Sequence, residues 1–276
     1  MRTVLVPLMQ GRVLTCALDA ACALAALHDG EVRVLVGRST TGPLTLAAGH
    51  LDAVSRLGLE RAVDAAAEDL AARARALLRP AEVRWRVDVA GTPWLEPGRQ
   101  ALLHARVADA VVLGRTEAPT EGERRLFGTL LLGAGRPVLL VPPATPSPVR
   151  LGRVAVAWKP VREAVRAVHD ALPVLVRADE VEVLTVGAPD DEEARAEAAS
   201  ADILDLLRAH GVRPRAVALP QTGHGTGEAI LAHAREAGSD LLVAGGYGRA
   251  RVVEQVFGGV TRTLSERAHL PVWFSH

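Results

Sequence analysis

Four of the five glycines between residues 245 and 259 are the residues best suited to chemistry in this sequence. Gly245 and Gly248 frame a tight turn after the apolar run DLLVAG (240–245), and Gly258 and Gly259 interrupt a stretch of helical period. Each glycine costs about 1 kcal/mol against Ala inside a helix, so the adjacent pair predicts a break and a new helix that begins near Gly259. The free N–H groups at such a helix start favour a phosphate. The alternative is a tight strand–helix loop that binds nothing.

Two other side chains could reach a ligand held by these glycines. Lys159 is the only lysine among the 32 Lys and Arg residues, and its ammonium group could attract a phosphate. A solvated surface lysine is the alternative. His224 lies just before an expected helix whose N-cap we assign to Thr226, and a plain loop histidine is its alternative reading.

Other catalytic and metal-binding patterns are missing from the sequence. The nine histidines show no metal-ligand spacing, and Ser39, Ser55 and Ser147 have no nucleophile-elbow context. Cys16 and Cys22 lie on different faces of an expected helix, so we interpret them as small apolar residues. We therefore expect no metal site and no catalytic residue.

Composition excludes several classes of partner. The 276 residues carry 32 basic and 32 acidic side chains with a pI near 7.2, without the basic face of a nucleic-acid-binding protein. No apolar run reaches the roughly 18 residues of a membrane span, and the start MRTVLVPLMQG lacks a signal-peptide pattern. We expect a cytoplasmic protein with neither nucleic acid nor membrane as a partner.

Short apolar runs alternate with stretches of helical period along the whole chain. Most runs are continuous, which is typical of parallel strands covered on both faces. Two of the helices are expected to end at Gly211 and Gly238. The expected strands are 3–8, 32–36, 83–89, 109–114, 137–141, 154–158, 181–186, 215–219, 240–245 and 271–274.

The strand pattern occurs twice. DAVVLG from residue 109 matches DLLVAG from 240, and RPVLLV from 136 matches LPVWFS from 270. The first copy is longer within 38–59. The connecting segment PPATPSPVRLG (142–152) has the composition of a semi-rigid linker. We expect two α/β domains, 1–143 and 152–276, joined by a Pro-rich linker at 144–151, each with a five-stranded parallel sheet.

The glycine segment resembles the nucleotide signature of universal stress proteins, G-x2-G-x9-G-[S/T]. DLLVAGGYG resembles the fourth strand and loop of that family, and LPVWFSH resembles its last strand. The doubled pattern is similar to the tandem, two-domain members and covers nearly the whole chain. The resemblance implies Rossmann-like domains with strand order 3-2-1-4-5, helices on both faces, ATP bound in some members, and a stress or regulatory role.

The resemblance also places a candidate nucleotide site, in the second domain only. It lies at the carboxyl ends of the first and fourth strands of that domain. Backbone N–H groups are expected to hold the phosphates, glycines to allow close approach, and backbone groups at two strand ends to flank the adenine. The N–H groups are those of Gly248, Gly259 and Val260, and the glycines that allow close approach are Gly245 and Gly258. Ala157 and Val186 flank the adenine, and Lys159 is a further contact.

Two positions of the second domain depart from the family pattern. Gly259 stands where ATP-binding members have Ser or Thr, which removes a hydroxyl group but keeps the backbone N–H. Lys159 stands where the family has Asp, which replaces a carboxylate with an ammonium group. We therefore expect weaker ATP binding than in members with the full motif.

The first domain departs further. Gly114 is kept, but Glu117 stands at the second glycine, and Glu121 and Glu123 would oppose a phosphate. The pair Gly128-Thr129 lies too close to the following strand to match Gly258-Gly259, so we interpret it as accidental. We expect no nucleotide in the first domain.

Three functions follow, in decreasing order of support. The first is a nucleotide-responsive regulatory protein, and the second is a scaffold with degenerate sites that docks a partner. The third is an enzyme that cleaves ATP, a weak ATPase at most, for which Glu254 is the only carboxylate near the glycines. The apolar last strands, 137–141 and 271–274, are expected to pair antiparallel and make a pseudo-dimer of the two domains, which leaves other surfaces for a homodimer.

Overall fold

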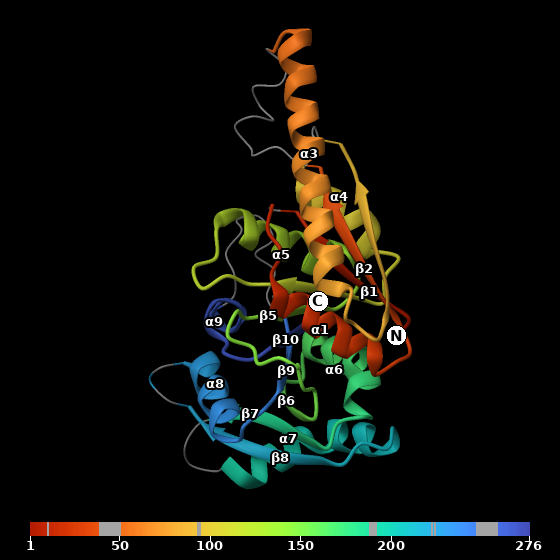
Figure 1. Cartoon of the computed structure of the whole chain (residues 1–276). Coiled ribbons are helices and arrows are strands. Elements are labelled where there is room, and N and C mark those ends of the chain that lie inside the picture. Colours follow the sequence, from red (N-terminus) through yellow and green to blue (C-terminus); the bar gives the residue numbers. More distant parts are fainter. Residues whose placement is uncertain are drawn as a thin grey trace. The chain divides into compact units, whose positions relative to one another are not determined.

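A computed structural model describes residues 1–9, 11–38, 51–92, 95–187, 192–221, 223, 225–246 and 259–276, without the side chains of 192–199. The chain divides into two compact units, Met1–Arg136 and Pro137–His276 (Figure 1). Each unit alternates strands and helices, as the apolar pattern predicts. Among the described residues each unit has four helices.

The first unit is a parallel sheet of four strands in the order β3-β2-β1-β4. Its strands β1 and β4 are almost entirely buried, as expected for continuous apolar runs. Its elements are β1 (Thr3–Leu8), α1 (Thr15–Ala26), β2 (Glu31–Gly37), α3 (Ala53–Leu78), β3 (Arg84–Ala90), α4 (Pro97–Ala105), β4 (Ala110–Gly114) and α5 (Glu121–Gly133).

The second unit has six strands in the order β5-β10-β9-β6-β7-β8, parallel except for the pair β5–β10. Its elements are β5 (Val138–Val141), β6 (Arg153–Ala157), α6 (Arg162–Leu175), β7 (Glu180–Gly187), α7 (Glu192–Ala209), β8 (Pro214–Pro220), α8 (Thr226–Glu236), β9 (Leu241–Gly245), α9 (Gly259–Arg267) and β10 (Val272–Ser275).

Both units have the Rossmann-like α/β fold that the sequence predicts. The order 3-2-1-4-5 is β8-β7-β6-β9-β10 in the second unit, and the first unit has β3-β2-β1-β4, its fifth strand β5 being grouped with the second unit. The expected antiparallel pairing of the last strands is confirmed, with Trp273 opposite Leu139. The repeat boundaries, 1–143 and 152–276, stay a prediction.

Helix ends follow local sequence signals with one exception. Gly211 and Gly238 have positive φ angles and end α7 and α8, as predicted. In each case the glycine N–H and the next N–H bond back to carbonyls of the last turn, which satisfies the helix end. The assignment of Thr226 as an N-cap is wrong. Gly225 takes that position with φ 92°, a conformation that favours glycine, and Thr226 is the first helical residue.

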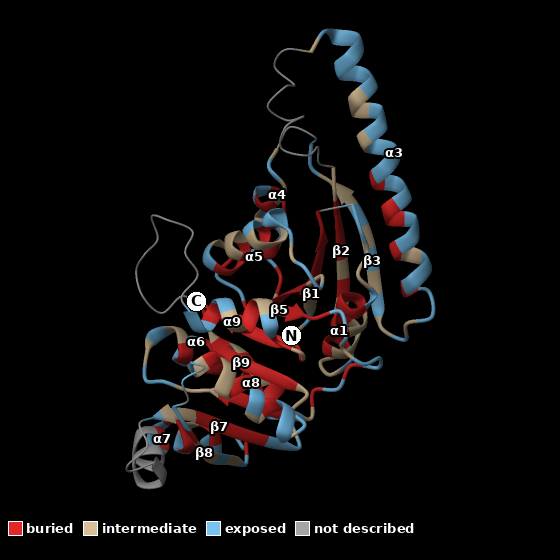
Figure 2. Cartoon of the chain, turned by 90° about the vertical axis from the view of Figure 1, so that its left-hand side faces the viewer, coloured by how far each residue is buried: buried red, intermediate tan, exposed pale blue. Residues whose placement is uncertain are grey.

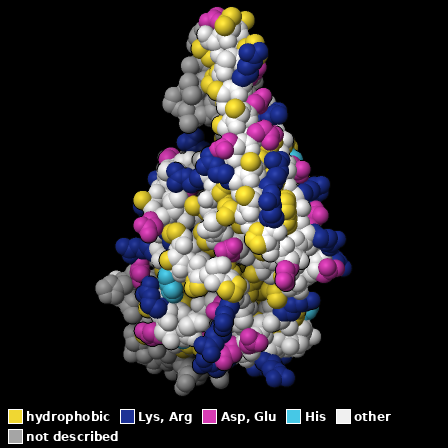
Figure 3. Space-filling view, in the orientation of Figure 1, with side chains coloured by type: hydrophobic (Ala, Val, Ile, Leu, Met, Phe, Trp, Pro, Cys, Tyr) yellow, Lys and Arg dark blue, Asp and Glu magenta, His cyan; other side chains and the backbone are white. Residues whose placement is uncertain are grey.

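Burial follows the sheets closely (Figure 2). The 26-residue helix α3 packs only with its C-terminal half, where all of its buried side chains lie: Ala67, Leu70, Ala71, Ala74 and Leu78. Residues 53–66 of this helix have no buried side chain. On the face shown in Figure 3, basic and acidic side chains are interspersed, in agreement with a net charge of zero.

Candidate functional site

The carboxyl ends of β6, β7 and β9 lie together at one edge of the second sheet. Ala157 pairs in register with Leu184 of β7 and with Ala244 of β9, directly before Gly245. The N–H of Trp158 donates to the Leu184 carbonyl at 2.8 Å and continues the β6–β7 pairing past Ala157. The strand order reverses between β6 and β9, which is where open α/β sheets bind ligands. The structure therefore brings Ala157 and Gly245 side by side at the expected place.

Val186 lies further along β7 than the residues that pair with β6. It is opposite Leu219 of β8 and is half-buried, two residues past Leu184. Lys159 is exposed just after β6, where its ammonium group is solvated. Both residues belong to the predicted edge, and Lys159 has the room that a phosphate contact would need.

Helix α9 is described from Gly259, where the adjacent glycines predict a new helix. A helix that follows one parallel strand and leads to the start of the next has its N-terminus at the carboxyl edge of the sheet. An added Cβ at Gly259 would meet no atom within 4 Å, and Val260 beside it is exposed. Among the described residues, nothing therefore blocks the approach of a ligand to Gly259 and Val260.

Gly245 has a structural reason to be glycine that needs no ligand. A Cβ there would lie 2.7 Å from the backbone N of Ala164 and from the backbone carbon of Glu163, in the first turn of α6. Gly114, which ends the fourth strand of the first unit, has the same relation to Leu14 at the start of α1, with 2.6 Å to Cδ1. Helix packing accounts for this glycine in both units.

Several predicted site residues lie outside the described residues. These are Gly248, Gly258, His224 and Glu254. Their proposed roles stay predictions from the sequence.

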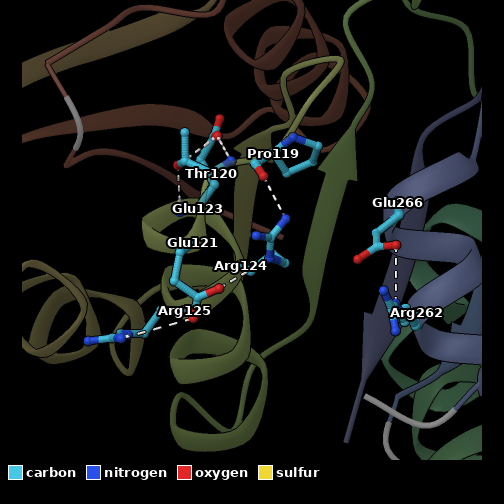
Figure 4. Close-up of polar contacts among 8 residues, drawn as sticks. All are labelled: Pro119, Thr120, Glu121, Glu123, Arg124, Arg125, Arg262 and Glu266. Atoms are coloured by element: carbon cyan, nitrogen blue, oxygen red, sulfur yellow. Dashed lines mark hydrogen bonds and ion pairs between the residues drawn. The ribbon is translucent and has the colours of Figure 1, made fainter. Parts of the chain in front are cut away.

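The first unit differs at the start of its last helix. Helix α5 begins with a capping box in which the Thr120 hydroxyl accepts from the Glu123 N–H, while the Glu123 carboxylate accepts from the Thr120 N–H at 2.7 Å (Figure 4). Arg124 of α5 donates to the Pro119 carbonyl. In the second unit, Arg262 of α9 pairs with Glu266 of the same helix. The capped α5 supports the expectation that no phosphate binds there.

The pair Gly128-Thr129 lies inside α5 and not at its start. The Thr129 methyl group would be 3.2 Å from a Cβ on Gly98 of α4, and Thr263 of α9 stands in the same relation to Gly227 of α8. Thr129 is therefore the packing counterpart of Thr263, which supports the interpretation that its likeness to the nucleotide motif is accidental.

Sequence reasoning missed a contact made by His276. Its Nδ1 lies 3.0 Å from the carbonyl oxygen of Gly246, and the Gly246 N–H donates to the Ser275 carbonyl at 2.8 Å. These two bonds fix the backbone where the glycine segment leaves β9. The sequence indicated this contact only indirectly, because the family's strand order 3-2-1-4-5 places β10 beside β9.

A buried polar cluster was also missed, in the first half of β7. The Glu182 side chain is 10% exposed; one carboxylate oxygen accepts from Arg215 of β8, and the other lies 2.6 Å from Nε2 of His233 in α8. The sequence shows Glu182 only as one residue inside an apolar run. The cluster ties α8 to the sheet, away from the carboxyl edge.

The remaining chemistry of the described chain is sparse. Burial raises the pKa of Cys16, and it raises the pKa of Cys22 to about 11, so both thiols stay protonated at neutral pH. In the described part of the chain no group of three His, Cys, Asp or Glu side chains could hold a metal ion, and none of its helices is long and apolar enough to cross a membrane.

Residues 152–276 match the sequence model of the universal stress protein family. The second half of the chain is a universal stress protein domain. This confirms the resemblance that the glycine segment and the last strand carry. No curated protein matches the sequence significantly.

Solved structures extend the universal stress protein fold to the first half. A universal stress protein from Archaeoglobus fulgidus DSM 4304 is 18% identical, with a TM-score of 0.73, over 99% of this chain and 95% of that chain. A functionally unknown protein from Pseudomonas aeruginosa PAO1 is 14% identical, with a TM-score of 0.61, over 100% and 92%. A shorter universal stress protein from Archaeoglobus fulgidus, solved in complex with dAMP, is 17% identical over 51% of this chain and 97% of that chain, with a TM-score of 0.36.

Proposed function

We propose that this chain is a regulatory universal stress protein of the cytoplasm that binds ATP or a related nucleotide in its second unit only. The observation that carries the proposal is the first described residue of α9, Gly259, where no described atom lies within 4 Å of an added Cβ, in the half that matches the family. The N–H groups of Gly248, Gly259 and Val260 would hold the phosphates. Ala157 and Val186 would flank the adenine through backbone groups.

The helix starts of the two units support a site in the second unit. Helices α4 and α5 are capped by their own side chains, Glu96 and Thr120, so these N–H groups already have acceptors. Helix α8, in the place of α4, begins after Gly225, which makes no side-chain cap. Helices α1 and α6, which follow the first strand of each unit, both lack a side-chain cap and do not distinguish the units. The N–H groups at the start of α8 therefore lack the side-chain acceptor that Glu96 gives to α4, and they remain available to an anion.

The test restores the hydroxyl group that the motif lacks. We expect Gly259→Ser to tighten ATP binding, because a hydroxyl–phosphate hydrogen bond contributes about 1.5–3 kcal/mol, or roughly ten- to a hundredfold in affinity. The new side chain displaces no described residue, because none has an atom within 4 Å of an added Cβ at Gly259. Titration calorimetry measures the change.

Gly58→Ser is the matched control, since Gly58 also lies in a helix with nothing within 4 Å of an added Cβ, but in the exposed half of α3. Equal ATP affinity in wild type and Gly259→Ser would contradict the proposed site. The packing role of Gly245 favours a second candidate, a scaffold without nucleotide, and absence of ATP binding in both proteins would support it.

A further inference from the structure

The first unit contains a small apolar cavity that the proposed nucleotide site does not explain. It lies between the carboxyl ends of β1 and β4, where the strand order reverses, and has a volume of about 40 Å³. That volume holds roughly three water molecules, which equals the three or four carbon atoms of a short branched chain. An adenine ring is too large for it. Its apolar wall includes Leu8, Met9, Leu14, Ala17, Leu113 and Leu126.

Two opposite charges line the same cavity without pairing with each other. Arg12 is exposed and has no hydrogen-bond or ion-pair partner among the described residues. Glu123 is half-buried, and its Oε2 accepts from Thr116 Oγ1 at 3.1 Å and from the Thr120 N–H at 2.7 Å. Its Oε1 has no partner in the described part of the chain. The cavity thus has an apolar wall, one cation and one carboxylate oxygen with free lone pairs.

We propose that this cavity binds a small α-amino acid with an aliphatic side chain. The side chain occupies the apolar space, the carboxylate pairs with Arg12, and the ammonium group pairs with Glu123. A simple carboxylate leaves Glu123 unpaired and a simple amine leaves Arg12 unpaired, so only a zwitterion pairs with both charges. The site is independent of the proposed nucleotide site in the second unit.

Three probes of one carbon skeleton test the charge requirement on the full chain. L-valine carries both charged groups, isovalerate lacks the amino group, and isobutylamine lacks the carboxylate. We expect L-valine to bind, and each of the other two to bind at least about tenfold more weakly, because a charge-assisted hydrogen bond is lost. Isovalerate binding as well as L-valine, or no binding of L-valine, would overturn the proposal.

Substitutions place the binding in the cavity. Arg12→Gln and Glu123→Gln each remove one charge, and Gln still serves at the third position of a capping box, so α5 keeps its start. Both are expected to weaken L-valine binding at least about tenfold, whereas Arg99→Gln, an exposed arginine of α4, leaves it unchanged. ATP binding serves as a second readout that none of these substitutions alters. Unchanged L-valine affinity in Arg12→Gln would overturn the proposal, whether or not ATP binds.

Discussion

Glu182 is the most buried acidic residue described in the second unit, and its partners account for that position. One oxygen is held by Arg215 and the other by His233, so the charge is compensated on two sides. His233 is largely buried, whereas the Arg215 side chain is 70% exposed. Loss of the histidine would leave a buried oxygen unpaired, and loss of the arginine would leave room for water.

We therefore expect His233→Ala to lower the free energy of unfolding by about 1–3 kcal/mol, the cost of an unsatisfied buried acceptor. Arg215→Ala should cost less, because its head group is mostly in water. Urea unfolding of both variants, with the exposed His210→Ala as control, measures the difference. A larger loss in Arg215→Ala than in His233→Ala would show that the ion pair dominates the cluster.

Asp109 makes the stability of the first unit depend on acid. Burial alone would raise its pKa, but the backbone N–H groups of Arg2 and Thr3, with the N-terminal ammonium group and Arg136, lower it below the usual value. A lowered pKa stabilises the fold above the unfolded-state pKa, and this contribution is lost as pH falls through the folded-state value.

We expect thermal stability to fall as the pH drops below about 4, and Asp109→Asn to show a smaller part of that decrease. Melting temperatures between pH 3 and pH 7 would test it, with the exposed Asp202→Asn as control. Identical pH profiles for wild type and Asp109→Asn would contradict the role of this carboxylate.

At the scale of elements, the strands could be predicted because each strand of a parallel sheet that is covered on both faces is a short continuous apolar run in the sequence. All ten predicted strands are present, and no end differs by more than one residue. The helix ends at Gly211 and Gly238 were also predictable, since a left-handed C′ residue favours glycine. Thr226 was assigned wrongly because Gly225 and Thr226 are adjacent and both residue types are found at N-caps. In the structure Gly225 occupies the N-cap with a positive φ angle.

The candidate site was less predictable, because its contacts join distant parts of the chain. Nothing near Gly246 in the sequence indicates His276, and nothing near Glu182 indicates His233. For Gly245 the sequence suggests a role in ligand binding, but the structure gives the glycine a packing role against α6.

The packing of Gly245 yields a prediction about the interface between β9 and α6. We expect Gly245→Ala to destabilise the protein by about 1–3 kcal/mol, because its Cβ would meet backbone atoms of α6 that cannot rotate away. Gly114→Ala should cost a similar amount, since its Cβ would lie 2.7 Å from the Cβ of Leu14, which side-chain rotation does not move. Gly187→Ala is the control, with open space around its Cβ. Chemical denaturation measures all three, and a Gly245→Ala protein as stable as the control would contradict the close contact.

At the scale of the whole molecule, the two copies of one fold differ in what their helix starts offer. In the first unit, α4 and α5 are closed by their own caps, and the remaining cavity admits only a few atoms. In the second unit, α8 lacks the side-chain cap that α4 has, and no described atom lies within 4 Å of an added Cβ at Gly259 of α9. We therefore propose one nucleotide site in the duplicated chain, in its second unit, and none in the first.

The number of ATP molecules bound per chain tests this central claim most directly. Titration calorimetry on Gly259→Ser, where binding is expected to be tightest, should give one ATP per chain. Adding Gly248→Val should abolish that binding, because the valine side chain blocks the expected approach of the phosphates to the backbone. Two ATP molecules per chain, or unchanged affinity after Gly248→Val, would contradict a single site in the second unit.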